Sequence, residues 1–280
     1  MIITPINPSD RQALAKLQHS VDFLLRYQVP ARIPQSVPAK KIVNCRHCKE
    51  EFAVTQPQGE CKHHSGKLER QGNDLIYTCC KRSNGAAPCA RSTRHVYSQD
   101  NAAEACSIIP FVTVTKTPKQ AYDALALDCE MGYTSLGSEV LRLTVVDFVT
   151  EKTVLDVYVK PKGQVWDYAT RYSGVTSEHM VNALSLEDAR AKLINMMSPQ
   201  TILIGHGLDH DLVCLRLAHA AVIDTSLFFP HQDGLPKRRS LKVLAMELLG
   251  RHIQADDQFH NPVEDALTAL HIVKQRINRV

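Results

Sequence analysis

From Tyr122 onward, short apolar runs predict a group of β-strands. The run 124–127 is apolar and ends at Asp128, and two β-branched runs follow it at 140–149 and 153–159. Runs of this length and composition are typical of strands, and the short polar turn between the last two indicates an antiparallel pair.

Helical and strand patterns alternate in the rest of the chain. Residues such as Ser185 and Asn261 mark helix starts, and Gly250 marks a helix end. The predicted elements are a helix over 185–197, a strand over 201–204, a helix over 209–218, a strand over 220–224, a helix from Ser240 to Gly250 and a last helix from Asn261. Antiparallel strands followed by alternating elements predict an α/β fold, a mixed β-sheet with flanking helices.

The part of the chain before Tyr122 has a weaker pattern. One helix is predicted near the N-terminus, with Ser9 as its N-cap and apolar residues at helical spacing up to Leu25. Six of the nine cysteines lie between Cys45 and Cys89, which indicates a small module, and a polar, mixed stretch after it is typical of a connection. The predicted domains are a helical segment over 1–40, the small module over 41–98, a linker over 99–121 and a second domain over 122–280.

Charge supports this division. Residues 1–120 carry 17 Lys and Arg against 9 Asp and Glu, whereas residues 121–280 carry 16 against 20, for a net charge of +4. A basic first part is attracted to polyanions such as nucleic acids. No apolar run reaches the roughly 18 residues of a membrane helix, and Met1–Pro5 does not begin a secretory signal, so we expect neither. An odd number of cysteines without an export signal favours metal binding over disulfides.

Two acidic residues at the end of the first strand are the first candidate site. Asp128 and Glu130 are two residues apart, so a strand places both carboxylates on one face and Cys129 on the other. Like charges held this close are unfavourable unless cations lie between them. A solvated strand end is the alternative interpretation.

Two further acidic segments follow helix-start patterns. Asp209 and Asp211 come directly after the strand 201–204, at the edge where α/β folds place their sites, and either could simply cap a helix. Asn261 is a good N-cap with Pro262 at the first helical position, so His260 and Asp265 occupy the two positions of a hydrophobic staple. This register predicts contact between an imidazole and a carboxylate, which indicates function because a staple is normally apolar.

In combination, these segments resemble the DEDDh exonuclease superfamily over roughly residues 122–277. Its three motifs match Asp128-Cys129-Glu130-Met131, Gly205-His206 with Asp211, and His260 with Asp265. The spelling of the first motif, with Arg171-Tyr172-Ser173-Gly174-Val175-Thr176 and Asn261-Pro262-Val263-Glu264-Asp265-Ala266, is similar to the Rex-type RNA exonucleases. The resemblance implies a ribonuclease H-like fold and a catalytic set of Asp128, Glu130, Asp211, His260 and Asp265.

The resemblance also implies a mechanism. The four carboxylates suit two Mg²⁺ or Mn²⁺ ions about 4 Å apart, which act on the attacking and leaving oxygens of a phosphodiester. His260, whose unperturbed pKa is about 6.5, takes a proton from the attacking water, and nucleoside 5′-monophosphates leave from a 3′ end. Met131 and Gly132 are candidates for holding the terminal nucleotide. Tyr172 is a further candidate, with a core position as the alternative.

The small module has the composition of a zinc-binding domain. Eight cysteines and histidines in about fifty residues fit two tetrahedral Zn²⁺ ions. The segments Cys61-Lys62-His63-His64-Ser65-Gly66 and Tyr77-Thr78-Cys79-Cys80 resemble CHORD-type domains. That resemblance implies one ion on Cys45, Cys48, Cys61 and His95 and a second on His64, Cys79, Cys80 and Cys89, with His63 as an alternative to His64. The module has basic side chains that could steer RNA, or it could bind a protein; these are Lys62, Lys67, Arg70, Lys81, Arg82, Arg91 and Arg94.

The sequence thus predicts a 3′–5′ exoribonuclease with two Mg²⁺ or Mn²⁺ and two Zn²⁺ ions, acting on single-stranded 3′ ends of RNA. The alternatives are a 3′–5′ exonuclease acting on DNA, and a zinc-based interaction module with a nuclease-like scaffold. Lys237-Arg238-Arg239 is a candidate for phosphate contact or for a nuclear address, against a solvated basic loop. The resemblance implies an intracellular, nuclear protein with no membrane contact.

Overall fold

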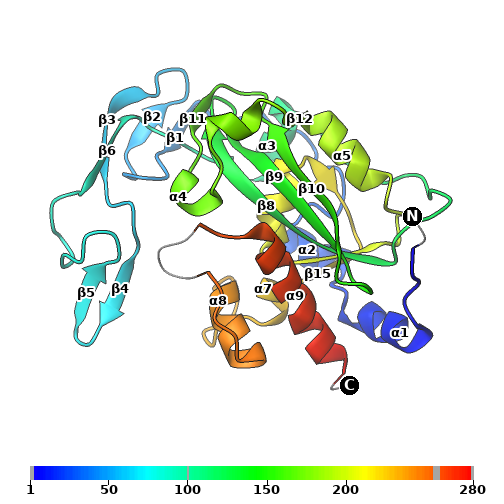
Figure 1. Ribbon diagram of the computed structural model, residues 1–280. Helices are drawn as coiled ribbons and strands as arrows, with labels where there is room; N and C mark the ends of the chain where they lie inside the picture. The colour runs from blue at the N-terminus through cyan, green and yellow to red at the C-terminus, as the bar shows by residue number, and fades with distance from the viewer. Residues whose placement is uncertain (1–2, 100, 255–258, 279–280) are drawn as a thin grey trace.

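A mixed seven-stranded sheet forms the centre of the second domain (Figure 1). The structure is a computed structural model that describes residues 3–99, 101–254 and 259–278. The strands β8, β9 and β10 pair antiparallel, whereas β13 pairs parallel to β8 and β15 parallel to β13. The sheet consists of β8 (Ala124–Thr134), β9 (Gly137–Asp147), β10 (Thr153–Lys160), β11 (Val165–Asp167), β12 (Leu184–Ser185), β13 (Ile202–Gly205) and β15 (Val222–Asp224), in the order β12-β10-β9-β8-β13-β15 with β11 paired to β8. The predicted α/β class is confirmed.

Helices cover both faces of this sheet. They are α4 (Thr170–Ser173), the 3₁₀-helix η1 (Ser177–Met180), α5 (Leu186–Ile194), α6 (Leu208–Cys214), α7 (Thr225–Phe228), α8 (Leu241–Leu244), the π-helix η2 (Ala245–Leu249) and α9 (Pro262–Ile277). Leu125 and Leu127 of β8 pack in a core with α5 and α6. Ala124 and Ala126 point to the opposite face, where α9 packs its buried stripe. Because strand side chains alternate, the α9 face is also the face of Asp128 and Glu130.

The ends of two elements that carry candidate residues differ from the sequence prediction. The strand β8 does not end at Asp128 but continues to Thr134, because it pairs with β9 along its whole length. The helix predicted over 209–218 ends at Cys214, since Arg216 has a φ of 52° and the strand β14 (Leu217–Ala218) follows it. The paired acids therefore lie in the middle of a strand rather than at its end.

The N-terminal segment forms two helices rather than the single one predicted. The helix α1 (Pro8–Leu17) is capped by Asn7, not by Ser9, and α2 (Val21–Arg26) is capped by Ser20. Each of these caps accepts a bond from a backbone N–H group of its own first turn, and this satisfies a donor that the helix leaves unpaired. Leu14 of α1 joins the core under α9, and α2 packs on the opposite core.

The cysteine-rich module consists of three small strand pairs and lies beside one end of the large sheet (Figure 1). The pairs are β1 (Ile42–Asn44) with β2 (Glu51–Ala53), β3 (Gln58–His63) with β6 (Ala90–Arg94), and β4 (Leu68–Gln71) with β5 (Asp74–Tyr77). Its apolar cluster is small and includes Cys45, Phe52, Cys61 and Tyr97.

The segment predicted as a linker has secondary structure of its own. It contains α3 (Ala102–Ile108), capped by Asn101, and β7 (Val112–Thr113), which pairs parallel with β14. Ala105 and Phe111 are buried against Ala218, so this segment packs onto the second domain. Across the described ranges, no helix combines the length and the apolar character needed to cross a bilayer.

Candidate active site

Strand β8 supplies two of the predicted carboxylates. Leu127 and Cys129 belong to the core under α5 and α6, which leaves Asp128 and Glu130 on the opposite, α9-covered face. The pairing of β8 with β9 shifts register directly after Glu130. The structure therefore confirms that Asp128 and Glu130 lie on one face of the strand and Cys129 on the other.

Helix α6 brings a third carboxylate to β8. The parallel pairing of β13 with β8 runs from Ala124 to Ala126, and beyond it the backbone N–H of Cys129 donates to Asp211 Oδ1 at 2.9 Å. Asp209, the alternative to Asp211, instead accepts from Arg238 Nη1 at 2.6 Å. The structure thus places Asp211, and not Asp209, against the strand of the paired acids.

Helix α9 supplies the fourth carboxylate and the histidine. Asn261 caps α9 by accepting from the backbone N–H of Val263 at 3.1 Å, and Pro262 stands in the first turn, as predicted. In this register His260 Nδ1 lies 3.9 Å from Asp265 Oδ2. The Asp265 side chain is only 5% exposed, whereas that of His260 is 42% exposed. The imidazole is therefore accessible to a substrate, and the carboxylate is covered.

Burial and mutual repulsion raise the pKa values of the carboxylates. Burial is the largest cause for each, and neighbouring carboxylates add to it. The pKa of Asp128 rises well above its usual range, the pKa values of Glu130 and Asp211 rise to about 8, and that of Asp265 rises to about 6. Burial, with a contribution from Lys67, lowers the pKa of His260.

The donor set fits divalent cations. Glu130 Oε1 is buried and has no hydrogen-bond partner among the described residues, although a buried carboxylate oxygen normally has one. Hard divalent ions such as Mg²⁺ prefer carboxylate oxygens and would relieve the repulsion among four acids. The acids are not one tight cluster: in the described ranges, only cysteine and histidine groups bring three ligand atoms within 4.8 Å of one another. A spread set suits two ions about 4 Å apart rather than one.

Two residues that support the site were not predicted. Gln254 Nε2 donates to both carboxylate oxygens of Asp265, at 3.0 and 2.9 Å. Asp224, at the end of β15, accepts from the backbone N–H groups of Gly207 and Leu208 at 3.0 and 2.9 Å and so fixes the start of α6. The position of Asp224 at the end of an apolar strand could have marked it as a candidate site residue, whereas nothing in the local sequence marks Gln254.

The predicted substrate-binding residues lie in different environments. Tyr172 is adjacent to His260: its carbonyl oxygen accepts from the His260 backbone N–H at 2.8 Å, and the two rings are 6.4 Å apart. Gly132 has no room for a side chain, because an added Cβ would lie 2.7 Å from Leu141 Cδ1. Met131 packs toward the core, where Cys214 Sγ lies 3.6 Å from its sulfur atom.

The basic run before α8 is neutralised by ion pairs. Lys237 pairs with Asp233, Arg238 with Asp209, and Arg239 with Glu247. These contacts favour a structural role for the run over free phosphate binding.

The eight predicted zinc ligands form two groups of four with the predicted partition. Cys45, Cys48, Cys61 and His95 make one group and His64, Cys79, Cys80 and Cys89 the other, and within each group all ligand atoms lie within 4.8 Å of one another. Cys48 Sγ is 3.3 Å from His95 Nδ1, and Cys80 Sγ is 3.5 Å from His64 Nδ1. Zn–S bonds of about 2.3 Å in a tetrahedron require separations of this order. His63, the alternative to His64, lies with His47 and Cys61 instead. None of the nine cysteines forms a disulfide.

Comparison with known proteins identifies the second domain. The Exonuclease family model, RNase_T, matches residues 125–273, the segment that holds all five predicted catalytic residues. The chain belongs to the exonuclease family. It is 38% identical over 256 residues to RNA exonuclease 3 of Candida albicans, a match that covers 88% of this chain and 62% of the relative. It is 37% identical over 272 residues to RNA exonuclease 3 of Schizosaccharomyces pombe, covering 94% of this chain and 49% of the relative.

These matches confirm the resemblance to Rex-type exonucleases, and the chain spans 49% to 62% of the length of these two relatives. Among solved structures, the exonuclease resembles the catalytic unit of Pan2 from Neurospora crassa, with its protease and nuclease domain, at a TM-score of 0.51 and 24% identity. That likeness covers 67% of this chain and 30% of the Pan2 chain. It supports the ribonuclease H-like fold predicted from the sequence.

Proposed function

We propose that this protein is a 3′–5′ exoribonuclease that hydrolyses phosphodiester bonds from RNA 3′ ends and releases nucleoside 5′-monophosphates. The observation that carries the proposal is the convergence of four carboxylates from β8, α6 and α9. Asp211 accepts from the backbone of Cys129. Burial raises the pKa of Asp128, and the charges of Asp211, Asp265 and Glu130 lie close enough to raise it further. His260 lies 3.9 Å from Asp265. The four carboxylates come from three elements far apart in the sequence, so their meeting requires the fold of the whole domain.

The four carboxylates are the proposed ligands of two Mg²⁺ or Mn²⁺ ions, which exonucleases of this family generally use. When bound, two such ions stabilise the charge that develops on the attacking and leaving oxygens of a phosphodiester. Cys129 N–H and Gln254 hold Asp211 and Asp265 in place through the hydrogen bonds described above. The unpaired oxygen of Glu130 is available to a cation.

His260 is the proposed general base. Its lowered pKa keeps the imidazole neutral at physiological pH, so a ring nitrogen can accept a proton from the attacking water. Its 42% exposure leaves it open to the substrate side, and Asp265 at 3.9 Å stabilises the imidazolium that forms. The backbone bond to Tyr172 fixes the position of His260.

The two cysteine and histidine groups are the proposed sites of two structural Zn²⁺ ions. The module has only a small apolar cluster, and a region with so little core needs such crosslinks to fold. Zinc would thereby set the position of the module's basic residues relative to the active site.

RNA is the proposed substrate because the relatives matched over most of this chain are named RNA exonucleases. The test is incubation of 5′-labelled single-stranded RNA and DNA with the protein and Mg²⁺ or Mn²⁺, with Asp211→Ala as the inactive control. A ladder of 3′-shortened RNA that is absent with Asp211→Ala supports the proposal. A ladder on DNA alone would reject the RNA substrate, and no ladder under either ion would reject the activity.

We also propose a nuclear location, which rests on the family resemblance alone. A fluorescent fusion of the chain that stays outside the nucleus would reject it.

A further inference from the structure

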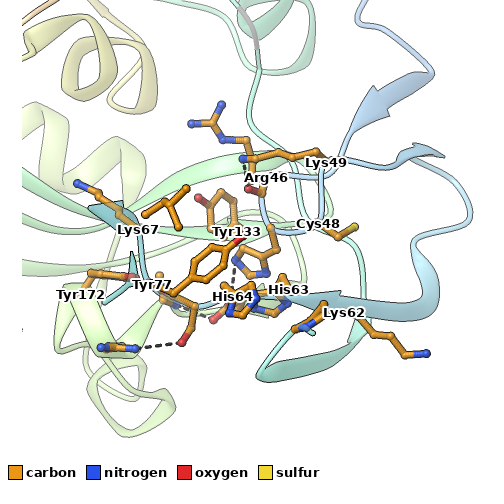
Figure 2. A pocket seen from close by; sticks show the side chains of 18 of the residues that line it. Arg46, Cys48, Lys49, Lys62, His63, His64, Lys67, Tyr77, Tyr133 and Tyr172 are labelled. Atoms are coloured by element: carbon orange, nitrogen blue, oxygen red, sulfur yellow. Dashed lines mark hydrogen bonds and ion pairs between the residues drawn. The ribbon is translucent and has the colours of Figure 1, made fainter. Parts of the chain in front are cut away.

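A deep cleft separates the cysteine-rich module from the exonuclease domain. It has a volume of about 980 Å³, and side chains of both parts line it (Figure 2). This volume is at the upper end of the range of about 300–1,000 Å³ that is usual for ligand sites. We call it the intermodule cleft, and its walls include Arg46, Lys49 and Lys67 from the module and Tyr133 and Tyr172 from the exonuclease domain.

The charge of the intermodule cleft suits a polyanion. Five of its lining residues are Arg or Lys, of which Lys62 pairs with Glu60 outside the lining at 2.8 Å. The lining itself holds a single carboxylate, Asp167, which lies 3.6 Å from His47. No carboxylate of the described ranges forms an ion pair with Lys67 or Lys49. Lys49 Nζ donates to the carbonyl oxygen of Arg46 at 2.5 Å and keeps its charge, so both charges are available to a ligand. Phosphate groups bind such lysines through charge and with little dependence on base sequence.

Rings line the same cleft. His47 and His63 stack with centroids 4.4 Å apart, and Tyr133 contacts His47 edge-on at 5.7 Å. Tyr77, also in the lining, stacks on His64 at 3.5 Å. Basic side chains interleaved with rings are typical of surfaces that bind single-stranded nucleic acid, where bases stack on the rings.

The intermodule cleft leads to the proposed active site. Tyr172 connects the two, since its hydroxyl donates to the Ser65 carbonyl oxygen of the module while its own carbonyl accepts from His260 N. Lys67 lies close enough to His260 for its charge to act on the imidazole. The ring of Tyr172, which lines the cleft, lies 6.4 Å from the ring of His260. A strand of RNA with its 3′ end at the carboxylates therefore reaches the cleft within a few nucleotides.

We propose that the intermodule cleft binds the single-stranded RNA segment that precedes the 3′-terminal nucleotide, with Lys49 and Lys67 on its phosphates and the rings against its bases. This inference rests on the proposed exoribonuclease function and deepens it. It gives the cysteine-rich module a direct part in holding substrate, and it predicts that the enzyme prefers RNA long enough to fill the cleft.

The experiment uses the full chain and compares two RNA substrates, a uridine trinucleotide and a uridine dodecanucleotide. The ratio of kcat/KM for the long substrate to that for the short one is measured for wild type, for the double variant Lys49→Gln/Lys67→Gln and for the control Lys116→Gln/Lys119→Gln. Lys116 and Lys119 are exposed and do not line the cleft, so the control also loses two positive charges but not the proposed contact. We expect wild type and the control to prefer the long RNA and the variant Lys49→Gln/Lys67→Gln to lose that preference.

Binding of the dodecanucleotide is measured separately in an Asp265→Asn background, where the RNA is not degraded. For a single strand, each phosphate contact contributes about −0.7 to the slope of log K against log salt, so the loss of two contacts makes the slope less steep by about 1.4. At about 0.1 M salt this corresponds to roughly 25-fold weaker binding. A double variant with the wild-type slope and length preference would overturn the cleft proposal while leaving the exoribonuclease intact. A wild-type protein that degrades neither RNA would instead reject the proposed function itself.

Discussion

The clearest energetic consequence of the site is that removing one of its carboxylates should stabilise the metal-free protein at pH 8. The pKa of Glu130 is raised from its usual 4.5 to about 8 by burial and by Asp265 and Asp211. The folded state therefore holds the Glu130 proton more tightly than the unfolded chain does. The contribution of Glu130 to the free energy of unfolding is therefore largest below about pH 4.5. It decreases by about 1.4 kcal/mol per pH unit as the pH rises toward 8.

These values set the size of the effect for Glu130→Gln. The ionised carboxylate costs the metal-free folded state roughly 4 kcal/mol at pH 8 and about 1 kcal/mol at pH 5. A glutamine keeps the shape but leaves a buried amide poorly bonded, which costs about 1–3 kcal/mol at either pH. We therefore expect Glu130→Gln to be more stable than wild type at pH 8 and equally or less stable at pH 5. The difference in free energy of unfolding between variant and wild type should change by about 3 kcal/mol between the two pH values.

The assay is thermal unfolding without added divalent ions, at pH 5 and pH 8. Chelators are left out because they would also remove metal from the cysteine groups. Glu178→Gln, at an exposed acid away from the site, is the matched control and should change stability by less than about 0.5 kcal/mol. Added Mn²⁺ should stabilise wild type at pH 8 far more than Glu130→Gln. Equal destabilisation by Glu130→Gln at both pH values, with an undiminished gain from Mn²⁺, would refute the reasoning.

Three further outcomes follow from the same structure. Gln254→Ala removes both hydrogen bonds to the Asp265 carboxylate. It should lower kcat at least tenfold, or about 1.4 kcal/mol, without lowering the zinc content. An unchanged kcat would show that Asp265 does not need this partner. Cys79→Ser should reduce zinc, measured by elemental analysis, from about two ions to about one per chain; a value still near two would contradict the assigned group. Leu203→Ala, in the fully buried middle of β13, should lower the free energy of unfolding by about 2–5 kcal/mol in a denaturant titration. A loss of less than about 0.5 kcal/mol, which is usual for a surface substitution, would contradict the packing.

Local chemistry explains why much of the site could be predicted. Asn261 and Pro262 fix the start of α9, and this start alone determines that His260 and Asp265 meet. The alternation of β8 likewise determines that Asp128 and Glu130 share a face. Both inferences depend on a few neighbouring residues whose backbone geometry is strongly constrained.

What could not be predicted depends on contacts between distant residues. The strand β8 continues past Asp128 although its apolar pattern stops there, because β9 supplies its hydrogen bonds. Gln254 donates to Asp265 although 11 positions separate them, and the contact of Ser65 with Tyr172 joins residues more than one hundred positions apart. The cap of α1 was predicted at Ser9 and lies at Asn7, because both residue types cap helices well and the local sequence does not decide between them.

The account depends most directly on the claim that four carboxylates from three elements share divalent cations. Mn²⁺ bound to the full chain can be counted by electron paramagnetic resonance in the presence of a nucleoside 5′-monophosphate. We predict two closely spaced Mn²⁺ ions in wild type and a loss of at least one in Asp211→Ala. Failure of wild type to bind Mn²⁺, or identical binding by Asp211→Ala, would contradict the proposed active site.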